Sequence, residues 1–384
     1  MDFTFTEEQK MLRETVKRFV DQEVRPLAQK IDEERNVPRD LIDKMAQLGF
    51  LGIVFPEKYG GVGAGEIGYC ILLEELARAC ASTATMVGAH QSIGAMAIYL
   101  DGNEEQKQKY LVPLAKGEKI GAFALTEPNA GSDAAGLETT AVEDGDTYLL
   151  NGQKIYITNG SIADIVSVFA VTDKEKGVRG GISAFIVETD TPGFRVGHIE
   201  DKMGIRGSKT AELFFENVPV PKENLLGRKG FGFMTAMKTL DVGRLSLAAA
   251  CIGAAKELID LSTQHAKTRV QFGKPIAEQQ AIKWMLAEMA ADIFAMESLT
   301  YRAAWMRDEG MRITRESAIA KMFASEALDR IVDKAVQIHG GIGYMAEYPI
   351  ERFYRDSRIN RIFEGTNEIQ RLVIAADILR KGGY

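Results

Sequence analysis

The sequence predicts a mainly α-helical protein with a central β domain, because the spacing of its apolar residues changes twice along the chain. Apolar residues recur at helical spacing in the first third, at every second position in the middle, and at helical spacing again toward the C-terminus. At 384 residues the chain is also too long for one hydrophobic core. We therefore expect an N-terminal helical domain over residues 1–119, a β-sandwich or barrel-like middle domain over 120–230, and a C-terminal four-helix bundle over 231–384.

The composition is that of an ordinary globular protein, with 46% hydrophobic and 26% charged residues. A net charge of -7 argues against a nucleic-acid-binding or anionic-membrane surface, because both need a basic field. The cysteines Cys70, Cys80 and Cys251 lie in apolar helical patterns without a CxxC pair, so we expect buried thiols and neither a disulfide nor a metal site. Because Met1–Thr6 carries no targeting signal and no segment is long enough to span a bilayer, we expect a cytoplasmic or already processed protein.

The N-terminal region begins with a capping box, in which Thr6 and Gln9 open an amphipathic helix over residues 7–34 with a kink at Pro26. Apolar spacing and cap residues predict further helices over 38–49, 69–80, 86–100 and 104–114. The first third of the chain is therefore expected to be helical.

The middle region alternates apolar and polar residues and is rich in β-branched and aromatic side chains. The predicted strands cover residues 122–126, 148–150, 154–158, 165–172, 182–188 and 212–215. Asn151-Gly152 predicts a two-residue hairpin turn, because both positions of such a turn favour positive φ. Pro219 and Pro221 are expected to end the β region, because proline donates no ladder hydrogen bond.

The C-terminal region contains four long apolar stripes at helical spacing. They predict helices over residues 234–261, 278–308, 314–339 and 368–381. Cofactor sites in such bundles are commonly built between helices or at their ends.

Glu364 is the carboxylate with the most unusual surroundings in the sequence. It lies between the apolar pair Ile362-Phe363 and the small Gly365, so lost hydration would raise its pKa toward the range of a general base. Gly365 would let a ligand approach the main chain. The alternative is a surface glutamate in a helix-capping turn, because Thr366 can open the following helix.

Two loops at strand ends of the β region are candidate binding segments. Residues 126–133 offer small residues, two hydroxyls and backbone N–H groups to a phosphate or a ring carbonyl, although a plain type I or II turn fits as well. Residues 156–160 end a strand with an aromatic ring and a hydroxyl, which suit a flat heterocycle or simply the end of an edge strand.

Three segments of the helical region are further candidates. Gly340 is expected to cap the preceding helix, but three glycines within residues 337–344 exceed what a cap needs. Arg269 follows a helix, where an arginine suits a pyrophosphate or is merely a loop charge. Asp241 and Arg244 suit a substrate-lining helix or an intrahelical ion pair.

As a set, these segments resemble the acyl-CoA dehydrogenase family, and most closely its short- and medium-chain, butyryl-CoA-dehydrogenase-like branch. The motifs are TEPNAGSD from residue 126, NGQKIYITNG from 151, DVGR from 241, RVQFGKPIAEQQ from 269, QIHGGIGY from 337 and FEGTNEIQR from 363. The resemblance implies a homotetramer, as a dimer of dimers, with one FAD per subunit. It also implies dehydrogenation of an acyl-CoA thioester to the trans-2-enoyl-CoA, with electrons passed to electron-transfer flavoprotein.

By this resemblance Glu364 removes the α-proton of the acyl-CoA, and its backbone N–H holds the thioester oxygen. The positions that match the family's substrate site are Ser132, Asp241, Val242, Gly243, Arg244 and Gly365. Those that match its FAD site are Phe123, Ala124, Leu125, Thr126, Ser132, Tyr156, Ile157, Thr158, Arg269, Phe272, Gln280, Gln337, Ile338, His339, Gly340, Gly341, Thr366, Asn367 and Glu368, some of them serving a neighbouring subunit.

Two positions bear on how far the resemblance extends. Tyr156 stands where the family usually has tryptophan, which keeps the stacking ring. Gly243 stands where some branches, including the isovaleryl type, place the base, and a glycine cannot serve as one.

Two other functions share these motifs. One is an acyl-CoA oxidase that passes electrons to oxygen, against which the ending Lys381–Tyr384, without a peroxisomal SKL signal, argues. The other is a non-catalytic flavin- or acyl-CoA-binding scaffold. The preferred acyl chain length is expected to depend on a pocket floor formed by residues 85–94, which include the small Gly88 and Ala89.

Overall fold

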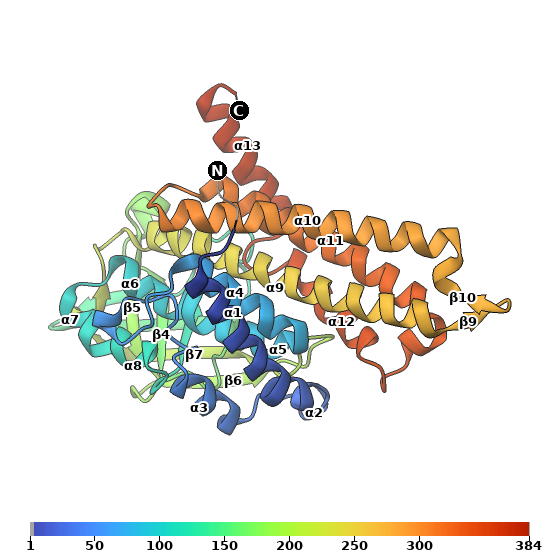
Figure 1. The fold of residues 1–384 in the computed structure, drawn as a ribbon. Helices are drawn as coiled ribbons and strands as arrows, with labels where there is room; N and C mark the ends of the chain where they lie inside the picture. The colour runs from blue at the N-terminus through green and yellow to red at the C-terminus, as the bar shows by residue number, and fades with distance from the viewer. Residues whose placement is uncertain (1–3, 384) are drawn as a thin grey trace.

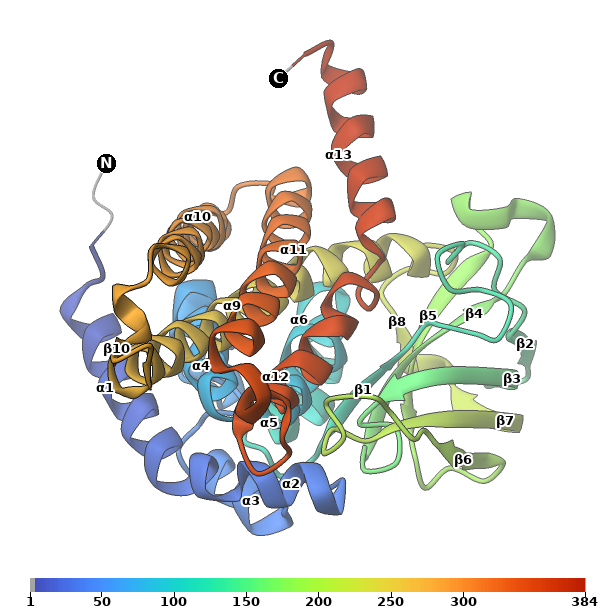
Figure 2. The ribbon, with the colours of Figure 1, turned by 90° about the vertical axis from the view of Figure 1, so that its right-hand side faces the viewer.

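The helices and the β-sheet occupy adjacent parts of the molecule (Figures 1 and 2). The computed structural model describes residues 4–383. The predictions that concern the first three residues and Tyr384, which are the ends of the two terminal domains and the absence of targeting signals there, lie outside the described residues. Along the chain a helical region is followed by strands and then by helices again, as the apolar spacing predicts.

The N-terminal region is helical from Glu7 onward. The predicted capping box is present: Gln9 N–H donates to Thr6 Oγ1 at 3.2 Å, and Thr6 N–H donates to Gln9 Oε1 at 3.0 Å. The helix expected over residues 7–34 is divided near Pro26 into α1 (Glu7–Phe19), a π-helical turn (Val20–Val24), a 3₁₀ turn (Arg25–Leu27) and α2 (Ala28–Glu34). The remaining N-terminal helices are α3 (Arg39–Gln47), α4 (Gly65–Ala79), α5 (Ala81–Gly88), the π-helical segment Ala89–Ala95, α6 (Met96–Asp101), α7 (Glu104–Gln106) and α8 (Val112–Ala115).

The middle region forms one eight-stranded sheet. Its strands are β1 (Gly121–Ala124), β2 (Thr140–Asp144), β3 (Thr147–Thr158), β4 (Ile165–Val171), β5 (Ile182–Glu188), β6 (Phe194–Ile199), β7 (Thr210–Pro221) and β8 (Leu225–Leu226). The order across the sheet is β6-β7-β3-β2-β4-β5-β8, and β1 pairs with β4 in parallel beside this path. β4 therefore carries neighbours on both edges and anchors the strand that leads to the 126–133 loop.

The predicted hairpin at Asn151-Gly152 is wrong. β3 runs through both residues, and a bulge shifts its register against β7 there. The turn lies earlier, at Gly145, where Asp144 pairs with Thr147. Asn-Gly serves the bulge because a Cβ on Gly152 would approach Thr139 Cα to 2.7 Å.

The two prolines lie at the end of β7, and only the two-residue β8 follows them in the sheet. They do not prevent pairing, because Pro219 and the last residue of β7, Pro221, pair with Leu149 and Thr147 of β3. This is possible because β6 pairs with β7 only as far as Phe215, so the other edge of β7 is open at the prolines.

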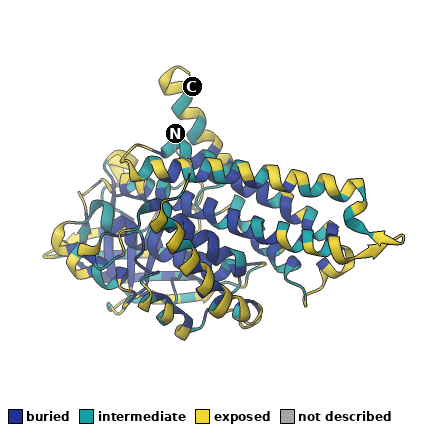
Figure 3. Cartoon of the chain, viewed as in Figure 1, coloured by how far each residue is buried: buried dark blue, intermediate teal, exposed yellow. Residues whose placement is uncertain are grey.

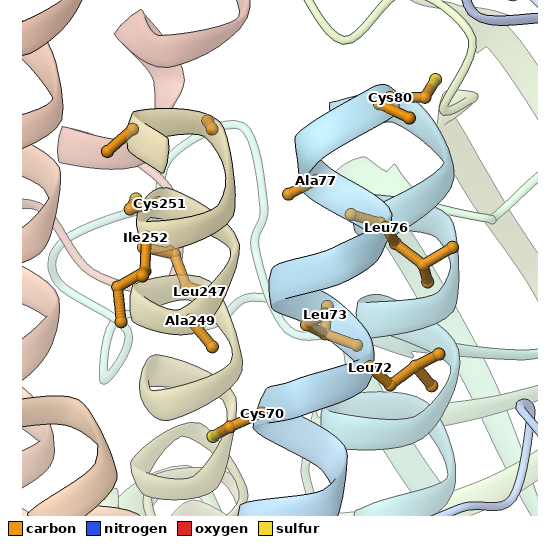
Figure 4. Packing of buried hydrophobic residues seen from close by; sticks show 14 of the residues in the cluster. Cys70, Leu72, Leu73, Leu76, Ala77, Cys80, Leu247, Ala249, Cys251 and Ile252 are labelled. Atoms are coloured by element: carbon orange, nitrogen blue, oxygen red, sulfur yellow. The ribbon is translucent and has the colours of Figure 1, made fainter. Parts of the chain in front are cut away.

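The C-terminal region contains α9 (Gly232–Thr268), α10 (Gln280–Asp308), α11 (Thr314–His339), α12 (Pro349–Ser357) and α13 (Asn367–Lys381). The first three pack side by side, whereas α13 leaves the others and projects from the molecule (Figures 1 and 2). The fourth helix packed on α9 is α4 from the N-terminal region (Figure 4). The expected four-helix bundle therefore takes one helix from outside residues 231–384.

Buried side chains form a continuous interior between the N-terminal and C-terminal helices (Figure 3). Cys70, Leu73 and Leu76 of α4 and Leu247 and Cys251 of α9 belong to it (Figure 4). Within residues 4–383 the cysteines are buried and unpaired, and no cluster of three or more histidine, cysteine or acidic side chains could hold a metal ion. No described helix combines the length and the apolar character needed to cross a membrane.

Candidate active site

Glu364 sits in a strained turn between the 3₁₀ segment Arg358–Arg361 and α13. Its φ is 56° and that of Gly365 is 88°, so two consecutive residues adopt the left-handed conformation. This conformation is unfavourable for a glutamate and persists only where the surroundings impose it. The Oε2 atom of Glu364 is buried and accepts no hydrogen bond within the described chain.

Two buried side chains hold this turn from behind. Lys321 Nζ donates to the carbonyl of Gly365 at 2.8 Å, and Gln370 Nε2 donates to the carbonyls of Glu364 and Gly365 at 3.2 and 2.9 Å. Sequence reasoning missed both residues, because lysine and glutamine are normally placed at the surface. A signal was present for Lys321, which stands three residues from Ala318 and from Ala324 on the apolar stripe of α11.

The electrostatic setting of Glu364 suits a base. Burial raises its pKa to about 7, and the cationic Lys321 and Arg244 oppose this rise. Burial lowers the pKa of Lys321 to about 8, against the attraction of Glu364. The raised pKa expected for a dehydrated carboxylate is therefore present.

The predicted substrate helix lies directly against this carboxylate. A Cβ on Gly243 would stand 3.2 Å from Cδ of Glu364 and closer still to Oε2. Arg244 Nη1 donates to Asp241 Oδ1 at 2.7 Å, so the intrahelical ion pair considered from the sequence exists. Nε of the buried Arg244 has no partner within the described chain, and Val242 packs in the core.

The predicted flavin segments of the sheet lie at the ends of β1 and β3. Phe123, Ala124 and Leu125 are buried, and Thr126 and Ser132 follow toward the surface. Tyr156 is 62% exposed and has a φ of 57°, because a bulge in β3 turns it out beside the buried Ile157 and the half-buried Thr158. The structure thus presents an exposed aromatic ring at a strand end.

A fully buried ion pair that sequence reasoning missed joins these two segments. Lys154 Nζ donates to the carbonyl of Leu125 at 3.0 Å and to Glu127 Oε1 at 2.6 Å. Glu127 Oε2 and Oε1 in turn accept from the N–H groups of Glu138 at 2.6 Å and Thr139 at 3.1 Å. The pair fixes the start of the 126–133 loop, and the segment Glu138-Thr139 that follows the loop, relative to β3.

The N-terminus of α13 follows the Glu364 turn. Thr366 caps it, with Oγ1 accepting from Ile369 N–H at 3.4 Å, and Glu368 is exposed in its first turn. Asn367 is 1% exposed, and its side chain bonds Lys321 and Ser325. The side chain of Asn367 is therefore occupied within the protein, and the predicted pyrophosphate contact at this helix N-terminus would involve its backbone.

The remaining predicted FAD residues gather at the opposite end of the helices. Arg269 and Gln280 flank the hairpin of β9 (Val270–Gln271) and β10 (Lys274–Pro275), which projects from the molecule (Figure 1). Phe272 at its tip is 94% exposed. Of the segment 337–341, Gln337, Gly340 and Gly341 are exposed, whereas Ile338 and His339 are buried.

The two groups of predicted residues lie toward opposite ends of α9. Gly243, beside Glu364, and Thr268, beside Arg269, are separated by about 38 Å along this helix at 1.5 Å per residue.

The residues present fit FAD. The exposed ring of Tyr156 and the open backbone around Gly365 suit a flat ring system, and the capped N-terminus of α13 suits a phosphate. At the far end, the exposed Phe272 and Arg269, which makes no ion pair within the described residues, suit an adenine nucleotide.

Comparison with known proteins places this architecture in a family. The sequence matches the N-terminal domain of acyl-CoA dehydrogenase over residues 6–118, the middle domain over 122–218 and the C-terminal domain over 230–379. The short-chain specific acyl-CoA dehydrogenase of Clostridium acetobutylicum is 47% identical, covering 99% of this chain and 100% of its own. The caffeyl-CoA reductase-Etf complex subunit CarC of Acetobacterium woodii is 45% identical, covering 98% and 100%.

Solved structures agree. Butyryl-CoA dehydrogenase from Megasphaera elsdenii superimposes with a TM-score of 0.97 at 46% identity, covering 99% of this chain and 100% of its own. An acyl-CoA dehydrogenase complexed with FAD from Bacillus anthracis gives a TM-score of 0.92 at 43% identity, covering 98% and 68%. The motifs, the order of the three regions and these full-length matches together lead to one conclusion: the chain belongs to the acyl-CoA dehydrogenase family and is an FAD-dependent acyl-CoA dehydrogenase.

Proposed function

We propose that the chain converts a short-chain acyl-CoA thioester to the trans-2-enoyl-CoA, with Glu364 as the base. The observation that carries this proposal is the buried, unpartnered Oε2 of Glu364, whose pKa burial raises to about 7. A carbon-bound α-proton needs a base that is dehydrated yet ionisable near neutral pH. Gly243 has no side chain, which leaves room on α9 for this carboxylate.

The reaction divides between the protein and its cofactor. Glu364 accepts the α-proton while the Cα–H bonding electrons form the new double bond. The backbone N–H of Glu364 donates to the thioester oxygen and stabilises the negative charge that develops there. Bound FAD supplies the acceptor for the hydride that leaves the β-carbon. The positive charge of Arg244, the residue after Gly243 on α9, favours the ionised form of the Glu364 carboxylate.

We also propose that the complete FAD site is built between subunits of a homotetramer, arranged as a dimer of dimers. Tyr156, Ile157, Thr158 and the residues of β1 would take the flavin end, and Arg269, Phe272 and Gln280 of a second copy would take the adenosine end. The separation of about 38 Å along α9 supports this division. The exposed Phe272 and the projecting α13, with Leu379 80% exposed, supply apolar surface for contact between copies.

The electron acceptor and the substrate are proposed from the relatives. The caffeyl-CoA reductase relative is named as part of an Etf complex, and two further matches are named short-chain specific or butyryl-CoA dehydrogenase. We infer electron-transfer flavoprotein as the acceptor and butyryl-CoA as a suitable test substrate. The division into residues 1–119, 120–230 and 231–384 stays a proposal that limited proteolysis can test.

Anaerobic reduction of the bound flavin by butyryl-CoA tests the proposal. The wild-type protein should bleach rapidly, and Glu364→Gln should keep FAD yet bleach several orders of magnitude more slowly. Glu66→Gln is the matched control, because Glu66 is also a buried carboxyl with an unpartnered oxygen and a raised pKa of about 8, caused by burial. Wild-type bleaching in Glu364→Gln would identify a different base.

Exposure of the reduced protein to air separates the alternatives. Slow reoxidation that electron-transfer flavoprotein accelerates is expected for the dehydrogenase. Rapid formation of peroxide would favour the oxidase, and no bleaching by any acyl-CoA would leave only a binding scaffold.

A further inference from the structure

Lys321 is a buried cation that the proposed chemistry does not use. Lys321 is 0% exposed in the N-terminal third of α11, where an apolar residue would be expected at a buried position. Burying a lysine is costly unless its donors and its charge are satisfied. Lys321 Nζ donates two hydrogen bonds to the segment that follows Glu364, one to the carbonyl of Gly365 and one to Oδ1 of Asn367, each at 2.8 Å.

These contacts close a small hydrogen-bonded frame around the turn. Asn367 Nδ2 donates to Ser325 Oγ at 2.9 Å, one helical turn beyond Lys321, so α11 grips the start of α13 at two levels. Gln370, 0% exposed, holds the same Gly365 carbonyl from the α13 side. Side chains of α11 and α13 therefore support the left-handed conformation of Glu364 and Gly365 through the carbonyls of the turn.

We propose that Lys321 is a positioning residue for the reaction: it fixes the Glu364-Gly365 turn through the Gly365 carbonyl, and its positive charge beside this turn favours the ionised form of the Glu364 carboxylate. This inference rests on the proposed role of Glu364 as the base. It assigns to Lys321 no contact with substrate or cofactor.

The charged and titratable groups around the pair are few. Arg244 of α9 acts on both Glu364 and Lys321, and Asp241 partly neutralises it through their ion pair. Tyr69 of α4 feels the charge of Glu364. Cys251 of α9 and Glu368 of α13 act on Lys321. Of the two cations that act on Glu364, Lys321 has the larger effect, and Arg244 is already paired with Asp241.

Three substitutions separate positioning from charge. Lys321→Met removes both the donor and the charge, Lys321→Gln keeps an amide donor without the charge, and Gln370→Leu removes the neutral donor to the same carbonyl. Lys256→Met is the control, because Lys256 is another largely buried lysine of the helical core, paired with Glu74 and Glu297. Lys321→Gln also keeps the test valid if Lys321→Met does not fold.

The primary measurement is the pH profile of kcat/KM for the FAD-loaded enzymes with butyryl-CoA, which reports ionisation in the free enzyme. In both Lys321 variants the acid limb of the kcat/KM profile should move to higher pH by about one unit, because loss of the positive charge raises the pKa of Glu364. Gln370→Leu should lower kcat by about tenfold or more while leaving that limb in place. Lys256→Met should match the wild type in both respects.

A second readout does not depend on turnover. The infrared band of the protonated Glu364 carboxyl can be identified because it is absent from Glu364→Gln. Titration of this band should show that the pKa of Glu364 rises in the Lys321 variants, in line with the shift of the acid limb. If Lys321→Gln and Lys321→Met keep the wild-type acid limb and titration, the inference is wrong. If Glu364→Gln itself keeps wild-type turnover, the assignment of the base fails instead, so the two failures are distinguishable.

Discussion

Gly243 and Glu364, 121 positions apart in the sequence, share one space: a Cβ on Gly243 would lie 3.2 Å from Cδ of Glu364 and would collide with Oε2. The same Cβ would also lie 3.1 Å from Cγ2 of Ile93. A side chain on α9 and the Glu364 carboxylate therefore exclude each other at this point. The missing side chain is as much a part of the site as the carboxylate.

Gly243→Ala is therefore expected to impair catalysis far more than stability. The added methyl would push the flexible end of Glu364 away from its position, and a displacement of about 1 Å costs on the order of 100-fold in rate. Steady-state kinetics with butyryl-CoA would measure the loss, and the thermal midpoint and FAD content would show that the fold is kept. Wild-type kcat/KM in this variant would mean that the carboxylate is not confined by α9.

The fold follows from the sequence because its elements have strong local signals. The capping box at Thr6 and the periodicity of α11 predict helices whose ends the structure reproduces closely. The error at Asn151-Gly152 has a physical cause: a glycine such as Gly152, whose φ is 151°, serves a bulge as readily as a turn, and the pairing with the partner strand decides which one forms.

The site was only partly predictable. Glu364 has a local signal in its apolar neighbours. Lys321 has none for its role, because its partner Gly365 lies 44 residues later in the sequence and reaches it only when the chain before α13 packs on α11. The position of Arg269 relative to Glu364 was likewise beyond sequence reasoning, because a motif gives no distance. Only the length of α9 shows that these two residues cannot meet in one chain.

The folded protein should become less stable relative to its Glu364→Gln variant as pH rises from 5 to 8. Burial raises the pKa of Glu364 from 4.5 to about 7, so the stabilisation from its neutral form is complete below pH 4.5 and is lost as pH approaches 7. The difference in unfolding free energy is at most on the order of 3 kcal/mol, at 1.36 kcal/mol per pKa unit.

Urea unfolding of the two proteins at matched concentration and at several pH values would measure this difference. The wild-type protein should also lose stability relative to Glu66→Gln as pH rises, because burial raises the pKa of Glu66 to about 8. A wild-type and Glu364→Gln difference that does not vary with pH would contradict the raised pKa.

Arg269→Ala should weaken FAD retention while leaving turnover per bound flavin nearly unchanged. Arg269 is exposed and makes no ion pair among residues 4–383. It follows Thr268, which lies about 38 Å along α9 from Gly243, the neighbour of Glu364. Loss of a hydrogen bond to a charged group should weaken binding by about 10- to 100-fold.

Flavin absorbance relative to protein after gel filtration would measure this loss. Lys267→Ala is the control, because Lys267 is an exposed cation at the same end of α9. Equal flavin loss in both variants would mean that any positive charge at this end of α9 has the same effect. Full retention of FAD in Arg269→Ala would mean that Arg269 does not belong to the cofactor site.

Gly88→Val should shift the enzyme toward shorter acyl chains. Gly88 ends α5, and a Cβ there would stand 3.3 Å from Leu73 Cδ1 and 3.9 Å from Tyr69 Oη, on the side of the segment 85–94 that we expect to form the pocket floor. Tyr69 Oη donates to the Gly88 carbonyl at 3.2 Å, so the added methyl groups would have little room to move aside. The ratio of kcat/KM for octanoyl-CoA to that for butyryl-CoA should fall by about tenfold or more, since one methylene in a pocket changes binding by that order.

Ala84→Val is the control: Ala84 is buried on the same helix, so overpacking there should lower stability without changing the ratio. Parallel chain-length profiles in all three proteins would place the pocket floor outside this segment.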